Sequence, residues 1–170
     1  MSCVGCAFGP FTGHTRDPLC PDHGIVKPTP VRIRVPKHNL DIPEAKLQEI
    51  TLAHVNRIPG VRFWRMNTGG ARTPTGFVHY GEPGQGDLGG IMRLPGIVGP
   101  NGRPVGLRAE IELKAKRGRL RDAQKEYGTM LDEFAGLYIV ARSLIEAVRP
   151  VCDAMGYVCE EFDPLAERAA

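Results

Sequence analysis

The chain has 170 residues, of which 42% are hydrophobic and 24% are charged. These fractions are ordinary for a globular protein and exclude a disordered or fibrous chain. The length suits one domain with a small appendage. No stretch approaches the roughly 18 apolar residues that a membrane helix requires. The N-terminus has neither the basic start nor the apolar core of a signal peptide, so we expect a cytoplasmic protein with reduced thiols.

The net charge of +3 is small, but the basic residues are concentrated in two segments. The first contains Lys27, Arg32, Arg34 and Lys37, and the second contains Lys114, Lys116, Arg117, Arg119, Arg121 and Lys125. In the second segment Asp122 is the one opposing acid. Two basic patches favour a phosphate-backbone partner, although a solvated charged surface explains them equally well.

Composition divides the chain into three regions. Residues 1–26 contain three of the five cysteines and little periodicity, so they cannot form a compact core of their own. Residues 27–40 contain three prolines among β-branched and basic residues, which is typical of an extended linker. Residues 41–170 show the periodic patterns of a folded domain.

Four side chains in the first region have the spacing of a zinc site. Cys3-x2-Cys6 and Cys20-x2-His23 form two close pairs that suit tetrahedral Zn²⁺. A segment this poor in large apolar residues would fold only with the metal, so we predict a structural zinc module. His14 is an alternative ligand, and the competing interpretation is a set of scattered cysteines in an unfolded tail.

The folded region begins with a helix and several strands. Asp41, Pro43 and Glu44 match a capping box, and the helix should end before Pro59-Gly60. Strands are then expected at residues 61–67 and 77–80, with a glycine-rich loop after Asn67. Residues 86–92 indicate an irregular strand, because three glycines weaken the pattern.

The clearest element runs from Val105 to Ala115, where apolar and charged residues alternate without a break. This pattern predicts a strand with one buried face and one charged, exposed face. A helix over residues 120–134 follows, with its apolar stripe ending at Phe134 and Gly136 closing it in the left-handed conformation. A short strand at 137–140 and a helix from Ser143 to about Met155 complete a mixed α/β fold.

Three charged side chains share one face of this strand. Glu110, Glu112 and Lys114 are two residues apart and so point the same way. Glu112 and a second carboxylate, which we assign to Asp87, can supply the oxygen ligands that Mg²⁺ prefers. Such a cation lowers the pKa of a bound water, while Lys114 can orient that water or neutralise charge on a phosphate.

Several motifs follow one another in a fixed order along the folded region: Gly86-Asp87-Leu88, Ile111-Glu112-Leu113-Lys114, Gly118-Arg119-Leu120 and Gln124. This ordered set resembles the PD-(D/E)xK nuclease superfamily, in particular its VRR-NUC branch of virus-type replication-repair nucleases. Glu44-Ala45-Lys46-Leu47-Gln48, Arg65-Met66-Asn67-Thr68-Gly69-Gly70 and Val140-Ala141-Arg142-Ser143 extend it to residues 44–148. Gly86 departs from the motif, which usually has proline there.

The resemblance implies a restriction-endonuclease-like core, with a mixed central sheet flanked by helices. It implies that Asp87, Glu112 and the backbone carbonyl of Leu113 hold Mg²⁺ or Mn²⁺, with Glu44 as an additional ligand. Lys114 would be the catalytic lysine and Gln124 a supporting polar residue. Family members that stand alone are similar to Holliday-junction resolvases, so we expect a homodimer acting on branched DNA, in the host cytoplasm if a phage encodes it.

The basic residues that we assign to DNA are Lys116, Arg117, Arg119, Arg121, Arg32 and Arg34. The leading function is therefore a metal-dependent, structure-selective DNA endonuclease. The alternative is a zinc-stabilised DNA-binding protein with an inactive nuclease fold. A sequence-specific, restriction-like nuclease ranks lower, because no separate recognition domain is evident.

Each site residue also has a simpler explanation. Glu112 and Lys114 could form a salt bridge on an exposed strand, and Asp87 could be a turn residue among glycines. Helix capping accounts fully for Glu44, and Gln124 could be a surface residue of its helix.

Overall fold

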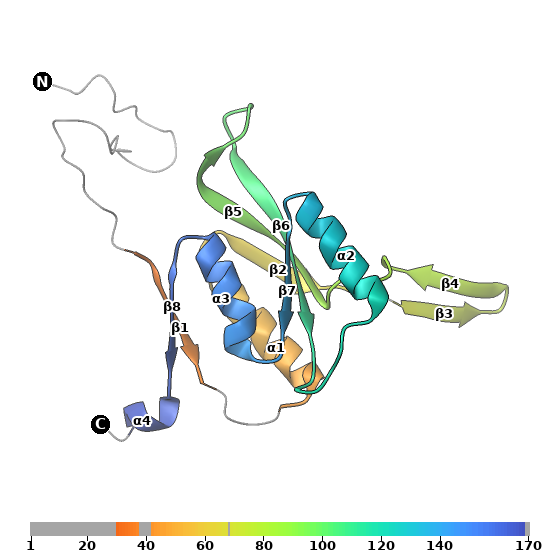
Figure 1. Ribbon diagram of the computed structural model, residues 1–170, viewed down its shortest axis with the longest axis horizontal. Coiled ribbons are helices and arrows are strands. Elements are labelled where there is room, and N and C mark those ends of the chain that lie inside the picture. Colours follow the sequence, from red (N-terminus) through yellow and green to blue (C-terminus); the bar gives the residue numbers. More distant parts are fainter. Residues whose placement is uncertain (1–29, 38–41, 68, 169–170) are drawn as a thin grey trace, which may run out of the picture. The chain divides into compact units, whose positions relative to one another are not determined.

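The computed structural model describes residues 30–37, 42–67 and 69–168, and shows a mixed α/β fold (Figure 1). Val31–Ala170 forms one compact unit. In chain order its elements are β1 (Arg32–Pro36), α1 (Glu44–Val55), β2 (Val61–Arg65), β3 (Gly69–Thr73), β4 (Gly76–Tyr80), β5 (Leu88–Val98), β6 (Pro104–Leu113), α2 (Asp122–Glu133), β7 (Leu137–Ala141), α3 (Leu144–Ala154), β8 (Val158–Phe162) and α4 (Pro164–Arg168). The expected zinc ligands Cys3, Cys6, Cys20 and His23, and the alternative ligand His14, lie outside the described residues.

The centre of the unit is a four-stranded mixed sheet in the order β2-β5-β6-β7. β2 and β6 run antiparallel to β5, whereas β7 runs parallel to β6. A parallel pair needs a crossover connection, and α2 provides it. The expected mixed sheet flanked by helices is therefore confirmed at this level: α1, α2 and α3 flank it.

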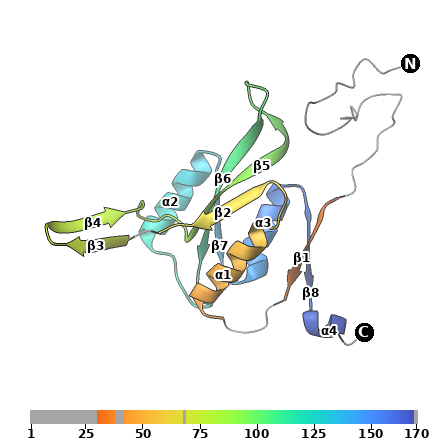
Figure 2. The same cartoon turned by 180° about the vertical axis from the view of Figure 1, so that it is seen from behind.

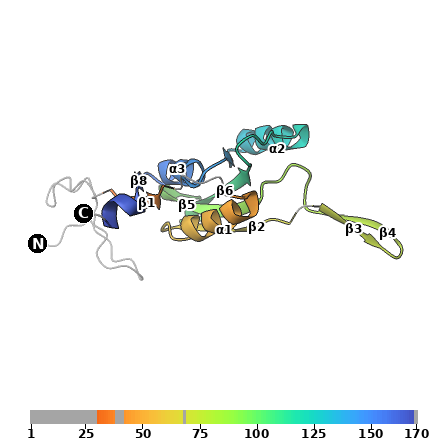
Figure 3. The same ribbon diagram turned by 90° about the horizontal axis from the view of Figure 1, so that it is seen from below.

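The two faces of β6 meet different helices. Ala109, Ile111 and Leu113 belong to the apolar core, together with buried side chains of α1 and α3. Glu110 and Glu112 project from the opposite face, where α2 covers them. Figure 3 shows α1 and α2 on different sides of the central strands.

The prediction that the charged face of this strand is exposed was wrong. Glu110 is 0% exposed and Glu112 is 3% exposed. Period-two alternation identifies which side chains share a face, but not whether another element covers that face. Here Tyr127 and Gln124 of α2 cover it and donate hydrogen bonds to both carboxylates.

Part of the segment expected to be a linker is a strand. Arg32–Pro36 forms β1, which pairs in parallel with β8 in a separate two-stranded sheet (Figure 2). Val35 of β1 is fully buried in the core. The sequence analysis missed β8, because two acidic residues interrupt its apolar pattern.

A third unexpected strand is β3, in the expected glycine-rich loop. It pairs with β4 in register, Gly69 opposite Tyr80 and Thr73 opposite Gly76. We call this hairpin, residues 69–80, the β3–β4 arm. All ten strand residues of the arm are exposed, and it extends away from the central sheet (Figure 1).

Two helix ends differ from expectation. α1 begins at Glu44 with Pro43 at its N-cap, so Glu44 lies in the first turn rather than completing a capping box from Asp41, which lies outside the described residues. α2 is followed by the left-handed residue Ala135, with φ of 56°, instead of Gly136. Phe134, expected in the apolar stripe of α2, is 79% exposed. By contrast, Ser143 caps α3 as expected and accepts a hydrogen bond from the Glu146 N–H.

Within the described residues, no helix has the length and apolar character needed to cross a membrane.

Candidate functional site

Asp87 lies immediately before β5, at the point where that strand runs beside β6. Its Oδ2 accepts a hydrogen bond of 2.8 Å from the Leu113 N–H. The preceding residue, Gly86, packs so closely that an added Cβ would lie 2.9 Å from the Ile111 carbonyl oxygen. The Asp87 carboxylate is therefore held against the end of β6 that carries the expected Glu-x-Lys motif.

Glu112, near the end of β6, and Lys114, directly after that strand, form a largely buried ion pair. Their Oε1 and Nζ atoms are 2.5 Å apart, and the Lys114 side chain is 13% exposed. Gln124 Nε2 donates to the same Glu112 oxygen at 2.6 Å, while its Oε1 accepts from the Arg121 N–H at the start of α2. Gln124, which is half-buried, therefore links the N-terminus of α2 to Glu112.

Glu110 occupies the same face but belongs to a different network. Its Oε1 accepts hydrogen bonds from Tyr127 Oη at 2.8 Å and from the Arg108 guanidinium at 2.6 Å. Its Oε2 accepts from the Gly86 N–H at 2.9 Å. A proline at position 86 would lack this donor, which gives a physical reason for the departure from the usual motif. Glu110 therefore anchors the segment that presents Asp87.

Two carboxylates of the site, Asp87 and Glu112, have raised pKa values. Burial raises the pKa of Asp87, and the negative charge of Glu44 raises it further, against the opposing Leu113 hydrogen bond. Burial also raises the pKa of Glu112, with a further contribution from Asp87, while Lys114 opposes it. Each ionised carboxylate thus carries an electrostatic cost, an arrangement often found where chemistry takes place.

Glu44 reaches the site from α1. Its Oε2 accepts a hydrogen bond of 3.1 Å from the Ala115 N–H, just after β6, although the residue itself is exposed. Its effect on the pKa of Asp87 shows that the two carboxylates are electrostatically coupled. Glu44 therefore contacts the site's backbone through its side chain, a role that helix capping alone does not explain.

Sequence reasoning missed Tyr138 on β7. Its hydroxyl donates to the Gly84 carbonyl at 3.0 Å, and its ring lies against Tyr127. Burial raises the pKa of Tyr138, and the charges of Glu112, Glu110 and Asp87 raise it further. The sequence did contain one indication of this role: Tyr138 is an aromatic residue with a polar hydroxyl in an otherwise apolar strand. Every second residue of β7 faces α2, so a polar group on that face needs a partner there.

The donor chemistry of the site fits a hard divalent cation in part. Asp87, Glu112 and Glu44 are electrostatically coupled carboxylates, and oxygen ligands suit Mg²⁺ or Mn²⁺. Their oxygens are directed to Leu113 N, Lys114 Nζ and Ala115 N, respectively. Accordingly, the described part of the chain contains no group of three or more His, Cys, Asp or Glu side chains arranged to hold a metal ion.

The basic residues assigned to DNA fall in two places. Lys116, Arg117, Arg119 and Arg121 are exposed in the loop between β6 and α2, directly after Lys114. Arg32 and Arg34 lie instead on β1, in the separate β1–β8 sheet, where they pair with Glu160 and Glu167. The structure therefore brings the loop residues to the site, but not Arg32 and Arg34.

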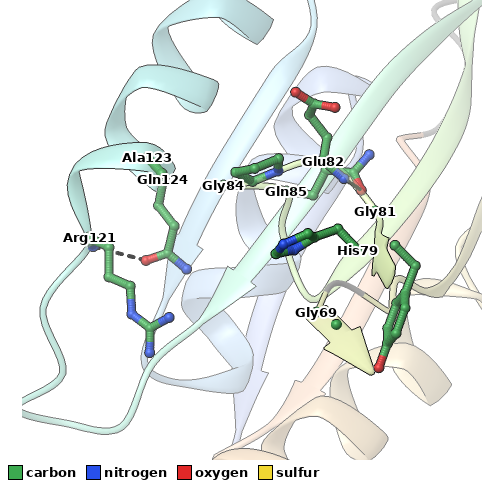
Figure 4. A pocket seen from close by; sticks show the side chains of 12 residues that line it. Gly69, His79, Gly81, Glu82, Gly84, Gln85, Arg121, Ala123 and Gln124 are labelled. Carbon is green, nitrogen blue, oxygen red and sulfur yellow. Dashed lines mark hydrogen bonds between the residues drawn. The ribbon is translucent and has the colours of Figure 1, made fainter. Parts of the chain in front are cut away.

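A cavity of about 460 Å³ lies between α2 and the base of the β3–β4 arm (Figure 4). Arg121 and Gln124 line one side, and Gly69, His79 and Tyr80 line the other. Because Gln124 also contacts Glu112, the cavity borders the candidate site.

Comparison with known proteins gave no match to a family model, to a curated protein or to a solved structure. Function must therefore be inferred from the site itself.

Proposed function

We propose that the protein is a metal-dependent endonuclease that hydrolyses DNA phosphodiesters, with a restriction-endonuclease-like core of the PD-(D/E)xK type. The observation that carries the proposal is the largely buried Glu112–Lys114 pair beside a second carboxylate, Asp87, which lies immediately before the neighbouring strand β5. Taking these charges out of water costs free energy that an exposed salt bridge would not incur. A catalytic role explains why the fold keeps them there.

Each residue has a distinct part in the proposed reaction. A divalent cation bound by Asp87, Glu112 and the Leu113 carbonyl, with Glu44 as an additional ligand, would supply an activated water and polarise the phosphate. Lys114 orients the attacking water and neutralises charge developing on the phosphate oxygens. Gln124 fixes the Glu112 carboxylate, and the Leu113 N–H fixes that of Asp87.

The neighbouring loop supports a polyanionic substrate. Its exposed basic residues, Lys116, Arg117, Arg119 and Arg121, follow Lys114 directly and can contact phosphates on either side of the cut. We propose branched DNA as the preferred substrate and a homodimer as the active form. A structural zinc bound by Cys3, Cys6, Cys20 and His23 belongs to the same proposal.

The test is incubation of the purified protein with labelled duplex, flap and four-way-junction DNA in Mg²⁺, Mn²⁺ or EDTA. Lys114→Ala is compared with Lys46→Ala, which alters an exposed lysine that pairs with Glu49 on α1, outside both basic segments. Metal-dependent cutting lost only in Lys114→Ala supports the nuclease. Binding without cutting under every metal would contradict it and favour a DNA-binding protein with an inactive nuclease fold. Cutting that survives Lys114→Ala would refute the site.

A further inference from the structure

The β3–β4 arm exposes large apolar side chains that the proposed chemistry does not use. Phe77, Val78 and Tyr80 are 54%, 52% and 48% exposed. Exposed groups of this kind in a protein mark interaction sites. We therefore expect the exposed side chains of the arm to form a binding surface.

Both faces of the arm carry aromatic rings over a thin backbone. The pairing register places Arg72, Phe77 and His79 on one face, where the Phe77 and His79 rings meet edge to face at 4.7 Å. The Phe77 ring occupies the space above Gly70, at 2.3 Å from where a Cβ would stand. On the other face, Tyr80 lies over Gly69. A Cβ at position 70 would clash with the Phe77 ring, whereas a Cβ at position 69 would come no closer than 3.4 Å to Tyr80, so only Gly70 is needed for the ring to lie where it does.

The positive charge of the arm favours a negatively charged partner. Residues 69–80 contain Arg72 and His79 but no Asp or Glu. A positive ribbon with exposed aromatic rings suits single-stranded nucleic acid, whose phosphates are negative and whose bases stack on rings. A second copy of the same arm would place equal charges against each other, which disfavours self-association through this surface.

The arm is also continuous with the candidate site. Its second strand leads through residues 81–86 directly to Asp87. At its base, His79 and Tyr80 share a cavity with Gln124, the residue that holds Glu112, and Figure 4 shows His79 on the opposite side of this cavity from Gln124. DNA bound along the arm would therefore enter the region of the carboxylates.

We propose that the β3–β4 arm is a stacking platform, in which Phe77 and Tyr80 hold unpaired bases of DNA next to the cleavage site. The inference rests on the proposed nuclease function and deepens it, since it assigns the recognition of unpaired DNA to particular side chains. Stacking on rings tolerates any base, so the arm selects for strand separation rather than for sequence.

The experiment measures binding to a duplex with an internal unpaired segment that carries the fluorescent base 2-aminopurine, in EDTA so that no cutting occurs. The fully paired duplex is the reference. Phe77→Leu with Tyr80→Leu keeps apolar volume on the arm but removes both rings. Phe77→Tyr with Tyr80→Phe keeps both rings. Phe134→Leu removes an exposed aromatic ring outside the arm.

The unmodified protein should quench the 2-aminopurine fluorescence and bind the unpaired DNA more tightly than the duplex. The double leucine variant should bind unpaired DNA about tenfold more weakly and lose the quenching. The ring-exchanged variant and Phe134→Leu should behave like the unmodified protein. Unchanged binding and quenching in the double leucine variant would overturn the proposal, as would a change in its oligomeric state with DNA binding intact.

Different results would refute the proposed nuclease and the proposed stacking platform. Loss of arm-dependent quenching, with cutting still abolished by Lys114→Ala, would remove the stacking platform and leave the nuclease. Arm-dependent quenching without metal-dependent cutting of any DNA would support the platform and remove the nuclease.

Discussion

Glu110 and Glu112 are chemically identical neighbours on one face of β6, yet the fold treats them differently. Both are buried, at 0% and 3% exposure. Glu110 accepts hydrogen bonds from three residues: the Gly86 N–H, the Arg108 guanidinium and the Tyr127 hydroxyl. Glu112 faces Lys114 and Gln124, with the charge of Asp87 nearby.

The difference teaches how one strand face can hold a structural and a reactive carboxylate. A buried carboxylate surrounded by donors is stabilised in its charged form, and removing it leaves those donors unsatisfied. A buried carboxylate beside another one keeps a raised pKa and gains when a cation or a positive group approaches. We therefore expect stability to depend on Glu110 and activity to depend on Glu112 and its partners.

The largest expected effect is at Lys114, the partner of the reactive carboxylate Glu112. Lys114→Gln keeps a hydrogen-bond donor for Glu112 but removes the positive charge. We expect DNA cleavage to fall by about 10²–10³-fold, because a charge that stabilises the transition state is lost. DNA binding, measured by fluorescence anisotropy in EDTA, should change little. Equal losses of binding and cleavage would instead assign Lys114 to the DNA-binding surface.

The structural role of Glu110 is tested by the substitution Glu110→Gln. A glutamine offers one acceptor oxygen and would direct its NH₂ group at another donor, leaving buried groups unpaired. We expect unfolding in urea to show a loss of about 1–3 kcal/mol. Glu133→Gln, at an exposed position of α2, serves as the control and should change stability little. No loss in Glu110→Gln would mean that the network around it contributes nothing to folding.

A smaller effect is expected from Tyr127→Phe. This change removes one hydrogen bond to Glu110 and keeps the ring that lies against Tyr138. The free energy of unfolding should fall by about 1 kcal/mol. In combination with Glu110→Gln the two losses should be less than additive, because both changes affect the same hydrogen bond. Full additivity would show that the two residues act independently.

The smallest effect concerns Asp87 and pH. Because the folded state raises the pKa of Asp87, its contribution to stability is present below the unfolded pKa and is lost as pH rises through the folded pKa. Asp87→Asn, which can still accept from the Leu113 N–H, should therefore have a slightly higher Tm than the unmodified protein at pH 7. The difference should shrink toward pH 4. A lower Tm for the variant at pH 7 would contradict the direction of this pKa shift.

Much of the site could be predicted from the sequence, because its chemistry is local. The alternation around Glu112 and Lys114 predicted their strand and shared face, and the structure places Glu112 near the end of β6 and Lys114 directly after that strand. The burial of Glu110 could not be predicted in this way, since it depends on Tyr127 of a helix that follows later in the chain. Short-range patterns do not reveal which element covers a face.

Each missed feature has its own physical reason. β3 contains two glycines, which weaken any strand pattern, and it pairs with β4. β1 and β8 are paired although residues 32 and 158 are far apart in the sequence. Ala135 takes the left-handed conformation, while an added Cβ on Gly136 would lie 2.6 Å from the Leu131 side chain. Close packing, rather than backbone freedom, explains the glycine at 136.

The most direct test of the central claim is the rate of DNA cleavage in Mg²⁺ by Glu112→Gln and Glu110→Gln, measured side by side below the unfolding temperature of both. The account predicts that Glu112→Gln loses cleavage almost completely, while Glu110→Gln stays within about tenfold of the unmodified protein because its partners position rather than react. Equal rates in the two variants, or cleavage that depends on Glu110 and not on Glu112, would contradict the assignment of Glu112 as the reactive carboxylate.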